Sequence, residues 1–283
     1  MNILQIFQSM AKTKSQIIGI GFGDSELHNQ KILDACINHI EEFNSKISIF
    51  GKKQYVESIQ SRNIADFEIN FIDSNNPELN IFEFLNKNKI GAIVRGSLSS
   101  SKFLENFKRS LKIDETNRLA LLETYQGHQF FFGPVGIDEC NTLDKKLRFL
   151  EYAINEFKTL KIIPKISILS GGRKSDLGRD NKVDESIKIA EKVVEQSKKK
   201  FQNTDISNDE ILIENAINNK SNLIIAPDGI SGNLIYRTLV HLGGGKAYGA
   251  IYMGLKDIII DTSRVGMVSE IQGALLLALA LTK

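Results

Sequence analysis

The stretch Leu223–Gly249 reads LIIAPDGISGNLIYRTLVHLGGGKAYG. It opens with an apolar run, Leu223–Ala226, bounded by a proline, which is typical of a buried strand. An Asp-Gly pair then predicts a turn, and a helix is indicated by apolar residues at helical spacing, namely Leu234, Ile235, Leu239 and Leu242. Three glycines end that helix. The free N–H groups at its start suit an anion, although an ordinary strand-to-helix connection has the same pattern.

The chain before this stretch alternates between short apolar strands and amphipathic helices. Strands are predicted at residues 16–20, 47–50, 67–72 and 92–94, each followed by a helical pattern. Such alternation predicts parallel strands with helices on both faces, an α/β fold. Further on, the pattern predicts a helix over Asp209–Ile217. Two short strands are expected around Gly254, and a buried helix is expected at the C-terminal GALLLALAL run, which is too short to span a bilayer.

Composition restricts the partners and the compartment. The 36 basic and 34 acidic residues give a net charge of +2, which favours neither nucleic acid nor a membrane surface as a partner. Two cysteines without metal-site spacing indicate a reducing cytoplasm, and the first residues do not form a secretory signal. The four histidines show no ligand spacing, so no metal site is predicted. The Gly19–Asp24 turn resembles a dinucleotide fingerprint only loosely, because its third glycine is misplaced.

Four polar loops follow predicted strands, and they carry the candidate chemistry. They are Arg95–Ser101, Ser170–Asp180, Asp228–Asn233 and Asp261–Arg264. Ligands of open α/β sheets collect beyond the carboxyl ends of the strands, so we expect these loops to converge on one cleft. A planar guanidinium suits phosphate or carboxylate because it donates two parallel hydrogen bonds. Each arginine alone is also compatible with a structural ion pair.

Four segments resemble the phosphate acetyl/butyryltransferase family, and more closely its methanogen branch, the MtxX-type methyltransferase-related proteins (methanogenesis marker protein 4). They are VRGSLSSSKFLENF from Val94, ILSGGRKSDLGRDNKVDESIKIAEKV from Ile168, IIAPDGISGNLIYRTLVHLGGGKAYGAIYMGL from Ile224 and DTSRVGMVSEI from Asp261. The third is the most specific, since it matches the P-D…G-N…Y pattern of the family. The first ninety or so residues resemble the family mainly in their α/β order.

The resemblance implies two three-layer αβα domains with a cleft between them, as in isocitrate and isopropylmalate dehydrogenases. The first domain would comprise residues 1–135 and 250–283, because the last strand and helix of that fold return to it. The second domain would comprise residues 136–249.

The resemblance also implies site residues. A Ser-Arg pair that acts on acyl and phosphate groups in the family matches Ser263 and Arg264. A proposed aspartate base matches Glu270, whose side chain is one methylene longer. The implied anion-binding residues are Arg95, Ser97, Ser99, Ser170, Arg173, Lys174, Asp228, Ser231, Gly232 and Asn233. The chain departs from the family at its S-T-[KR]-G-S loop, where Ser170–Ser175 reads SGGRKS.

Two functions follow from the resemblance. One is an MtxX-type transferase of methanogen one-carbon metabolism, working with other methyltransferase subunits. The alternative is a phosphate acyltransferase, for which coenzyme A and phosphate would be substrates rather than bound cofactors. The resemblance also implies an anionic small-molecule substrate and a homodimer.

Overall fold

The computed structural model describes residues 2–60, 67–202, 204–263 and 266–283, and the chain forms two compact units. Unit 1 comprises Met1–Glu115 and Ala247–Lys283, and unit 2 comprises Thr116–Lys246. The boundary predicted at residue 135 therefore falls inside unit 2. The reason is a hairpin in which residues 118–123 pair antiparallel with residues 129–133, so that both strands belong to the second unit.

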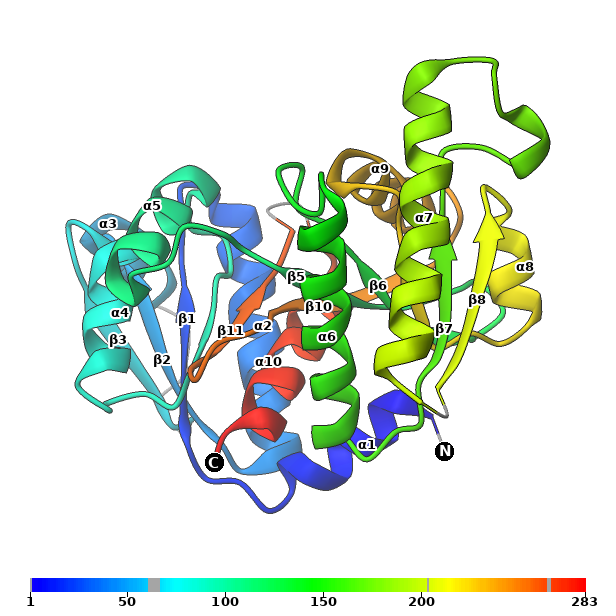
Figure 1. Cartoon of the computed structure of the whole chain (residues 1–283). Coiled ribbons are helices and arrows are strands. Elements are labelled where there is room, and N and C mark those ends of the chain that lie inside the picture. The colour runs from blue at the N-terminus through cyan, green and yellow to red at the C-terminus, as the bar shows by residue number, and fades with distance from the viewer. Residues whose placement is uncertain (1, 61–66, 203, 264–265) are drawn as a thin grey trace. The chain divides into compact units, whose positions relative to one another are not determined.

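Unit 1 is an α/β sheet with the strand order β3-β2-β1-β4-β11-β10 (Figure 1). Strands β1, β2, β3, β4 and β11 are parallel, and β10 runs antiparallel to β11. Its elements are α1 (Ile3–Ala11), β1 (Ile17–Gly21), α2 (Glu26–Phe43), β2 (Lys46–Gly51), α3 (Lys53–Gln60), β3 (Ile69–Asp73), α4 (Pro77–Asn86), β4 (Ala92–Val94), α5 (Ser100–Leu111), β10 (Lys246–Tyr252), β11 (Ile258–Asp261) and α10 (Val268–Leu281).

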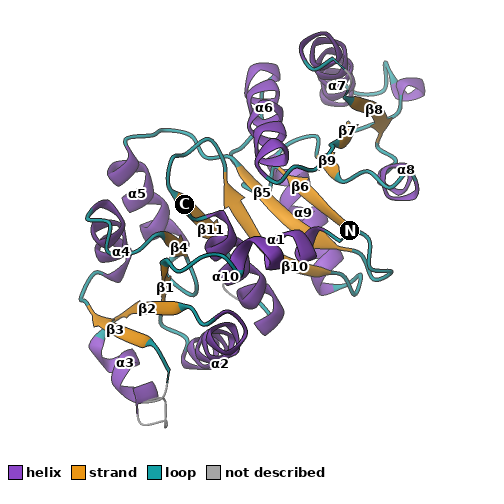
Figure 2. Ribbon diagram, turned by 90° about the horizontal axis from the view of Figure 1, so that it is seen from below, coloured by secondary structure: helices purple, strands orange, loops and turns teal. Residues whose placement is uncertain are grey.

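Helices cover both faces of this sheet (Figure 2). Helix α10 packs on β1, β4 and β11, while α4 packs on β1, β2 and β4. Every residue of α10 from Gly273 to Ala280 is buried, which confirms the buried C-terminal helix. The helix approaches β10 closely, since a Cβ on Gly273 would lie 2.6 Å from the Tyr248 Cβ. The first turn of α10 is thereby fixed next to the end of β11.

Unit 2 has the strand order β5-β6-β9-β7-β8, in which β6, β9, β7 and β8 are parallel and β5 is antiparallel to β6. Its elements are β5 (Arg118–Glu123), β6 (Gln129–Gly133), α6 (Leu143–Thr159), β7 (Lys165–Leu169), the short 3₁₀ helix η1 (Lys174–Asp176), α7 (Asn181–Lys200), β8 (Asp205–Glu210), α8 (Ile213–Asn218), β9 (Leu223–Ile225) and α9 (Gly229–His241).

One expectation about unit 2 is wrong in part. The helix expected over Asp209–Ile217 begins only at Ile213, as α8, and its first two residues, Asp209 and Glu210, end the strand β8. The segment DISNDE has no apolar alternation because it lies at the edge of the order, paired with β7 only. The helix expected after the Asp-Gly turn is present as α9, and Leu234 on it is 60% exposed, while Leu242 directly after it is 84% exposed. The buried positions of α9 are Gly229 and Gly232.

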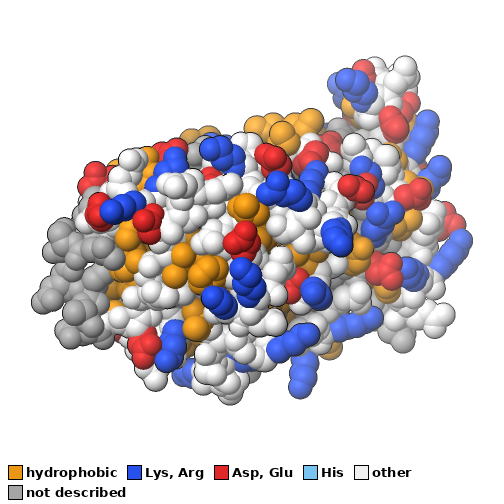
Figure 3. Space-filling view, turned by 90° about the vertical axis from the view of Figure 1, so that its left-hand side faces the viewer, with side chains coloured by type: hydrophobic (Ala, Val, Ile, Leu, Met, Phe, Trp, Pro, Cys, Tyr) orange, Lys and Arg blue, Asp and Glu red, His pale blue; other side chains and the backbone are white. Residues whose placement is uncertain are grey.

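The surface is mixed in charge. Figure 3 shows basic and acidic side chains interspersed on one face, without a continuous basic stripe. Among the described residues, no helix is long and apolar enough to cross a membrane.

Candidate functional sites in the two units

The loop after β11 carries the predicted catalytic residues of unit 1. Strands β1, β4 and β11 end side by side, because Ile20 and Ile260 both pair with Val94. The Ser263 backbone N–H donates to Glu270 Oε1 at 2.7 Å. Glu270 lies in the first turn of α10 and is buried. The structure thus brings Ser263 and Glu270 together, whereas Arg264 lies outside the described residues.

Arg95 holds this loop from the inside. Its guanidinium is buried and contacts Asp261 through Nε and the Thr262 carbonyl through Nη2, while Nη1 donates to the Leu98 carbonyl at 3.0 Å. The Thr262 hydroxyl adds a hydrogen bond to the Gly96 carbonyl at 3.0 Å. These bonds tie the loop after β4 to the loop after β11. The arginine predicted as an anion ligand therefore serves as an internal clamp.

The two predicted serines of the loop after β4 differ in role. Ser97 is buried; its Oγ accepts a hydrogen bond from the Gly23 N–H at 2.7 Å and donates to Asn29 Oδ1 at 2.6 Å. Those contacts join the loop to the turn after β1. Ser99 is half-buried directly before α5, with its Oγ 3.3 Å from the Ser101 Oγ. Of these two, Ser99 is the residue that solvent reaches.

The loop after β7 in unit 2 also contains both buried and exposed residues of the predicted site. Ser170 is buried and donates to the Gly172 carbonyl at 2.7 Å. Arg173 and Lys174 are exposed, and Lys174 Nζ lies 3.4 Å from Glu191 Oε1. The Arg173 backbone N–H donates to Asp176 Oδ2 at 2.8 Å, which is the main reason why the pKa of Asp176 is lowered. The loop presents cationic side chains, while its serine stabilises the turn.

The turn after β9 is the organising stretch of the sequence, and its amides are largely used within unit 2. Asp228 caps α9 by accepting from the Ser231 N–H at 2.8 Å. The Gly229 N–H donates to the Glu139 carbonyl at 3.1 Å, and Asn233 Nδ2 donates to the Val135 carbonyl at 2.9 Å. A Cβ on Gly232 would collide with the Pro134 carbonyl oxygen. This turn is an ordinary, tightly packed connection, so the alternative of an anion-binding turn is not favoured.

Two buried charged residues of unit 2 escaped the sequence analysis. Lys146 is 1% exposed, and its Nζ donates to the Pro227 carbonyl. Burial lowers the pKa of Lys146, while the charges of Cys140 and Asp228 raise it. A signal was present, because Lys146 shares its helix face with the buried residues Phe149, Leu150, Ala153 and Phe157.

Glu139 is the second missed residue. It is 3% exposed and accepts from Arg118 Nε at 2.7 Å, from the Gly136 N–H at 3.1 Å and from the Thr116 hydroxyl at 3.0 Å. Burial raises the pKa of Glu139 despite the neighbouring Arg118. Nothing in the local pattern distinguished this carboxylate from a surface residue, since its partner is Arg118 on another element.

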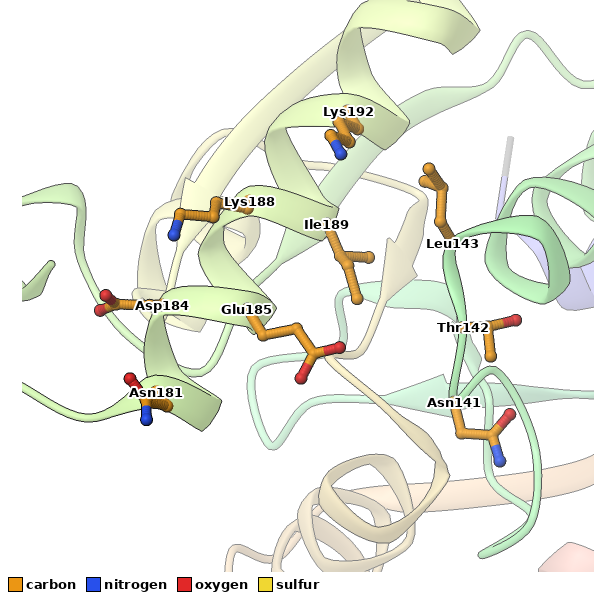
Figure 4. A pocket seen from close by; sticks show the side chains of 9 residues that line it. All are labelled: Asn141, Thr142, Leu143, Asn181, Asp184, Glu185, Lys188, Ile189 and Lys192. Carbon is orange, nitrogen blue, oxygen red and sulfur yellow. The ribbon is translucent and has the colours of Figure 1, made fainter. Parts of the chain in front are cut away.

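A groove of about 470 Å³ lies between α7 and the loop that starts α6 (Figure 4). Glu185 and Ile189 point from α7 towards this loop, whereas Asp184 and Lys188 point away from it. The full lining is Asn141, Thr142, Leu143, Asn181, Asp184, Glu185, Lys188, Ile189 and Lys192. Its charges are mixed, and none of the predicted site residues lines it. Among the described residues, no group of three or more His, Cys, Asp or Glu side chains is placed to hold a metal ion.

Comparisons with known proteins agree with this architecture. The proteins named "Putative methyltransferase mtx subunit X" from Methanosarcina mazei and Methanosarcina acetivorans are 35% and 36% identical over 280 residues, covering 99% of this chain and 95% of theirs. A phosphotransacetylase structure from Streptococcus pyogenes superposes with a TM-score of 0.73 at 16% identity, over 99% of this chain and 98% of that one. Residues 17–279 match the family described as phosphate acetyl/butaryl transferase. The chain belongs to that family.

Proposed function

We propose that this chain is an MtxX-type transferase of methanogen one-carbon metabolism that acts on a small anionic substrate carrying a phosphate or thioester group. The observation that carries the proposal is the contact between Ser263 and the buried Glu270 at the end of β11. Family membership and the names of the methanogen relatives support it. Within the part of the predicted anion-binding set that lies in unit 1, the half-buried Ser99 is the residue whose placement best suits contact with a substrate.

The alternative is a phosphate acyltransferase, and its reaction would be acyl transfer between phosphate and a thiol. Glu270 would take the proton of the thiol, and the sulfur would attack the carbonyl carbon of an acyl phosphate. The new carbon–sulfur bond forms as the carbon–oxygen bond to phosphate breaks, and inorganic phosphate leaves. Ser263 would hydrogen-bond the developing oxyanion, and Arg264 would neutralise charge on the phosphate.

The test is an assay of acyl-coenzyme A formation from acetyl phosphate and from butyryl phosphate. Glu270→Gln should lower kcat by about 10²–10⁴, because a positioned general base contributes that much. Arg264→Lys should lower kcat/KM, since an ammonium does not reproduce bidentate binding of phosphate. Lys199→Ala, which removes an exposed helical ion pair, is the control for protein quality. No turnover with either acyl phosphate would exclude the acyltransferase version.

The names of the relatives also indicate partners for the MtxX-type transferase, which would work as a subunit of a methyltransferase complex. The surface it would use is the uncovered face of α9, where Ile230, Leu234 and Leu242 are each at least 60% exposed. A second copy of the chain is the other occupant we propose for this face, as a homodimer. Light scattering of the purified chain separates the two: a dimer that Leu234→Glu converts to a monomer supports self-association, and a stable monomer contradicts it.

A further inference from the structure

Unit 1 contains a hollow of about 190 Å³ beneath its helices, distinct from the loop after β11. His39, Glu42 and Phe43 of α2 form one wall. Gln8 of α1 and the α10 residues Gln272 and Leu276 form the others. Helix α10 packs against both α1 and α2, so the hollow lies where the three helices meet. It has apolar walls and a polar wall, the mixture that small-molecule sites usually have.

The imidazole of His39 is the unusual group in this hollow. The side chain is only 3% exposed, and among the described residues no hydrogen-bond partner lies within reach of its Nε2. The ring packs against Phe43 with a centroid separation of 4.9 Å. Burial lowers the pKa of His39 to about 4, so the imidazole is neutral near pH 7 and its Nε2 can accept a hydrogen bond. Buried polar atoms are rarely left without a partner, so an unpartnered acceptor beside a hollow points to a ligand.

The charge of the lining decides which ligand fits. The Glu42 carboxylate lines the hollow, and no lysine or arginine is among the described residues that line it. The amides of Gln8 and Gln272 can both donate and accept hydrogen bonds, so the charge of Glu42 decides between an anion and a cation. An anion would meet one uncompensated negative charge, whereas a cation would gain from Glu42 and from the faces of aromatic rings.

We propose that this hollow binds a small primary amine, whose ammonium group donates to His39 Nε2 beside Glu42 and whose short carbon chain packs against Phe43 and Leu276. The proposal is independent of the reaction assigned to Ser263 and Glu270. Either proposal can fail without the other.

The experiment uses three probes with the same carbon chain and different head groups: n-butylamine, butyramide and butyrate. Binding is followed by NMR, from the ring signals of His39 and the side-chain amide signals of Gln272. We expect n-butylamine to saturate with a dissociation constant of about 1–10 mM, as suits a ligand of so few atoms. Butyramide should bind at least threefold more weakly, and butyrate should not bind. Equal binding of all three probes, or no binding of the amine at 100 mM, overturns the proposal.

Two variants test the contacts separately. His39→Phe keeps a ring against Phe43 but removes the acceptor, and we expect at least a tenfold weaker affinity for n-butylamine. Glu42→Gln should weaken n-butylamine binding and leave butyramide unchanged, because only the ammonium gains from the carboxylate. If His39→Phe does not fold, Gln272→Leu on the opposite wall takes its place, and it should also weaken the amine. Unchanged affinity in these variants overturns the proposal.

Discussion

Among the residues that the structure describes, each unit holds one buried lysine or arginine at the carboxyl ends of its strands, and the two cations are stabilised differently. Arg95 in unit 1 contacts the Asp261 carboxylate and the carbonyls of the loops after β4 and β11. Lys146 in unit 2 donates to the Pro227 carbonyl, and its lowered pKa shows that nearby charges do not offset its burial. Both therefore hold loops together, but within the described residues only the arginine lies within salt-bridge distance of a carboxylate.

The cost of removing a buried cation depends on whether its partner is charged. A buried charge whose partner is also charged leaves that partner unpaired when it is lost, and this is strongly destabilising. A buried ammonium with a neutral partner carries its own desolvation cost, so its removal relieves a penalty as well as breaking a bond. The free energy of unfolding should therefore fall further when Arg95 of unit 1 is replaced than when Lys146 of unit 2 is replaced.

The largest effect is expected from Arg95→Met. The change leaves the Asp261 carboxylate, whose side chain is 13% exposed, without its guanidinium. We expect the free energy of unfolding to fall by about 3–5 kcal/mol, the range for breaking a buried ion pair. Denaturant titration of the full-length chain measures this.

The double variant Arg95→Met/Asp261→Asn is the control for this reading. An asparagine carries no charge, so the double variant should recover part of the loss, with a coupling of at least about 1 kcal/mol. Additive losses would mean that Arg95 acts by packing rather than as a clamp between charges.

Much of the fold could be predicted because its signals are local. The strand Ala92–Val94 and the buried C-terminal helix follow from runs of apolar residues, and the structure has both. The strand β8 could not be predicted, because its pairing with β7 is tertiary and its sequence, DISNDE, is polar. The boundary between the units was misplaced for a similar reason, since the β5–β6 hairpin is set by pairing.

The candidate site residues could be named from the sequence, but their surroundings could not. Ser263 and Glu270 are named through the family resemblance, and in the structure the Ser263 N–H donates to the Glu270 carboxylate. Whether a polar residue faces solvent or its own loop is not readable, because that depends on partners such as Asp261 for Arg95 and Gly172 for Ser170. Residue type in a loop therefore indicates that a site is possible, while burial decides which residues remain for a ligand.

An intermediate effect is expected from acid, through His39. Its pKa is about 4 in the folded chain against 6.5 for an unperturbed histidine, so the unfolded state binds the proton more readily. The stabilisation of the folded chain by neutral His39 is complete above pH 6.5, and it is lost as the pH falls from 6.5 to 4. The loss should reach about 2–3 kcal/mol relative to His39→Phe, which does not titrate. Parallel stability curves for the two proteins between pH 7 and pH 4 would contradict the burial argument.

The smallest effect is expected from Lys146→Met, and it separates the two units most clearly. The variant loses the hydrogen bond to the Pro227 carbonyl, at a cost of about 1 kcal/mol, but it also removes a desolvated ammonium from a similar volume. We expect the free energy of unfolding at pH 7 to change by less than about 1.5 kcal/mol, well below the effect of Arg95→Met.

The sign of the pH dependence of the Lys146→Met effect follows from the lowered pKa of Lys146. Above the folded pKa and up to the unfolded value, near 10.5, the native lysine becomes neutral first, so the wild-type protein should gain stability relative to the variant as the pH rises. Calorimetry of both proteins between pH 7 and pH 10 measures this gain, and a loss as large as that of Arg95→Met would show that Lys146 carries a charge pair after all.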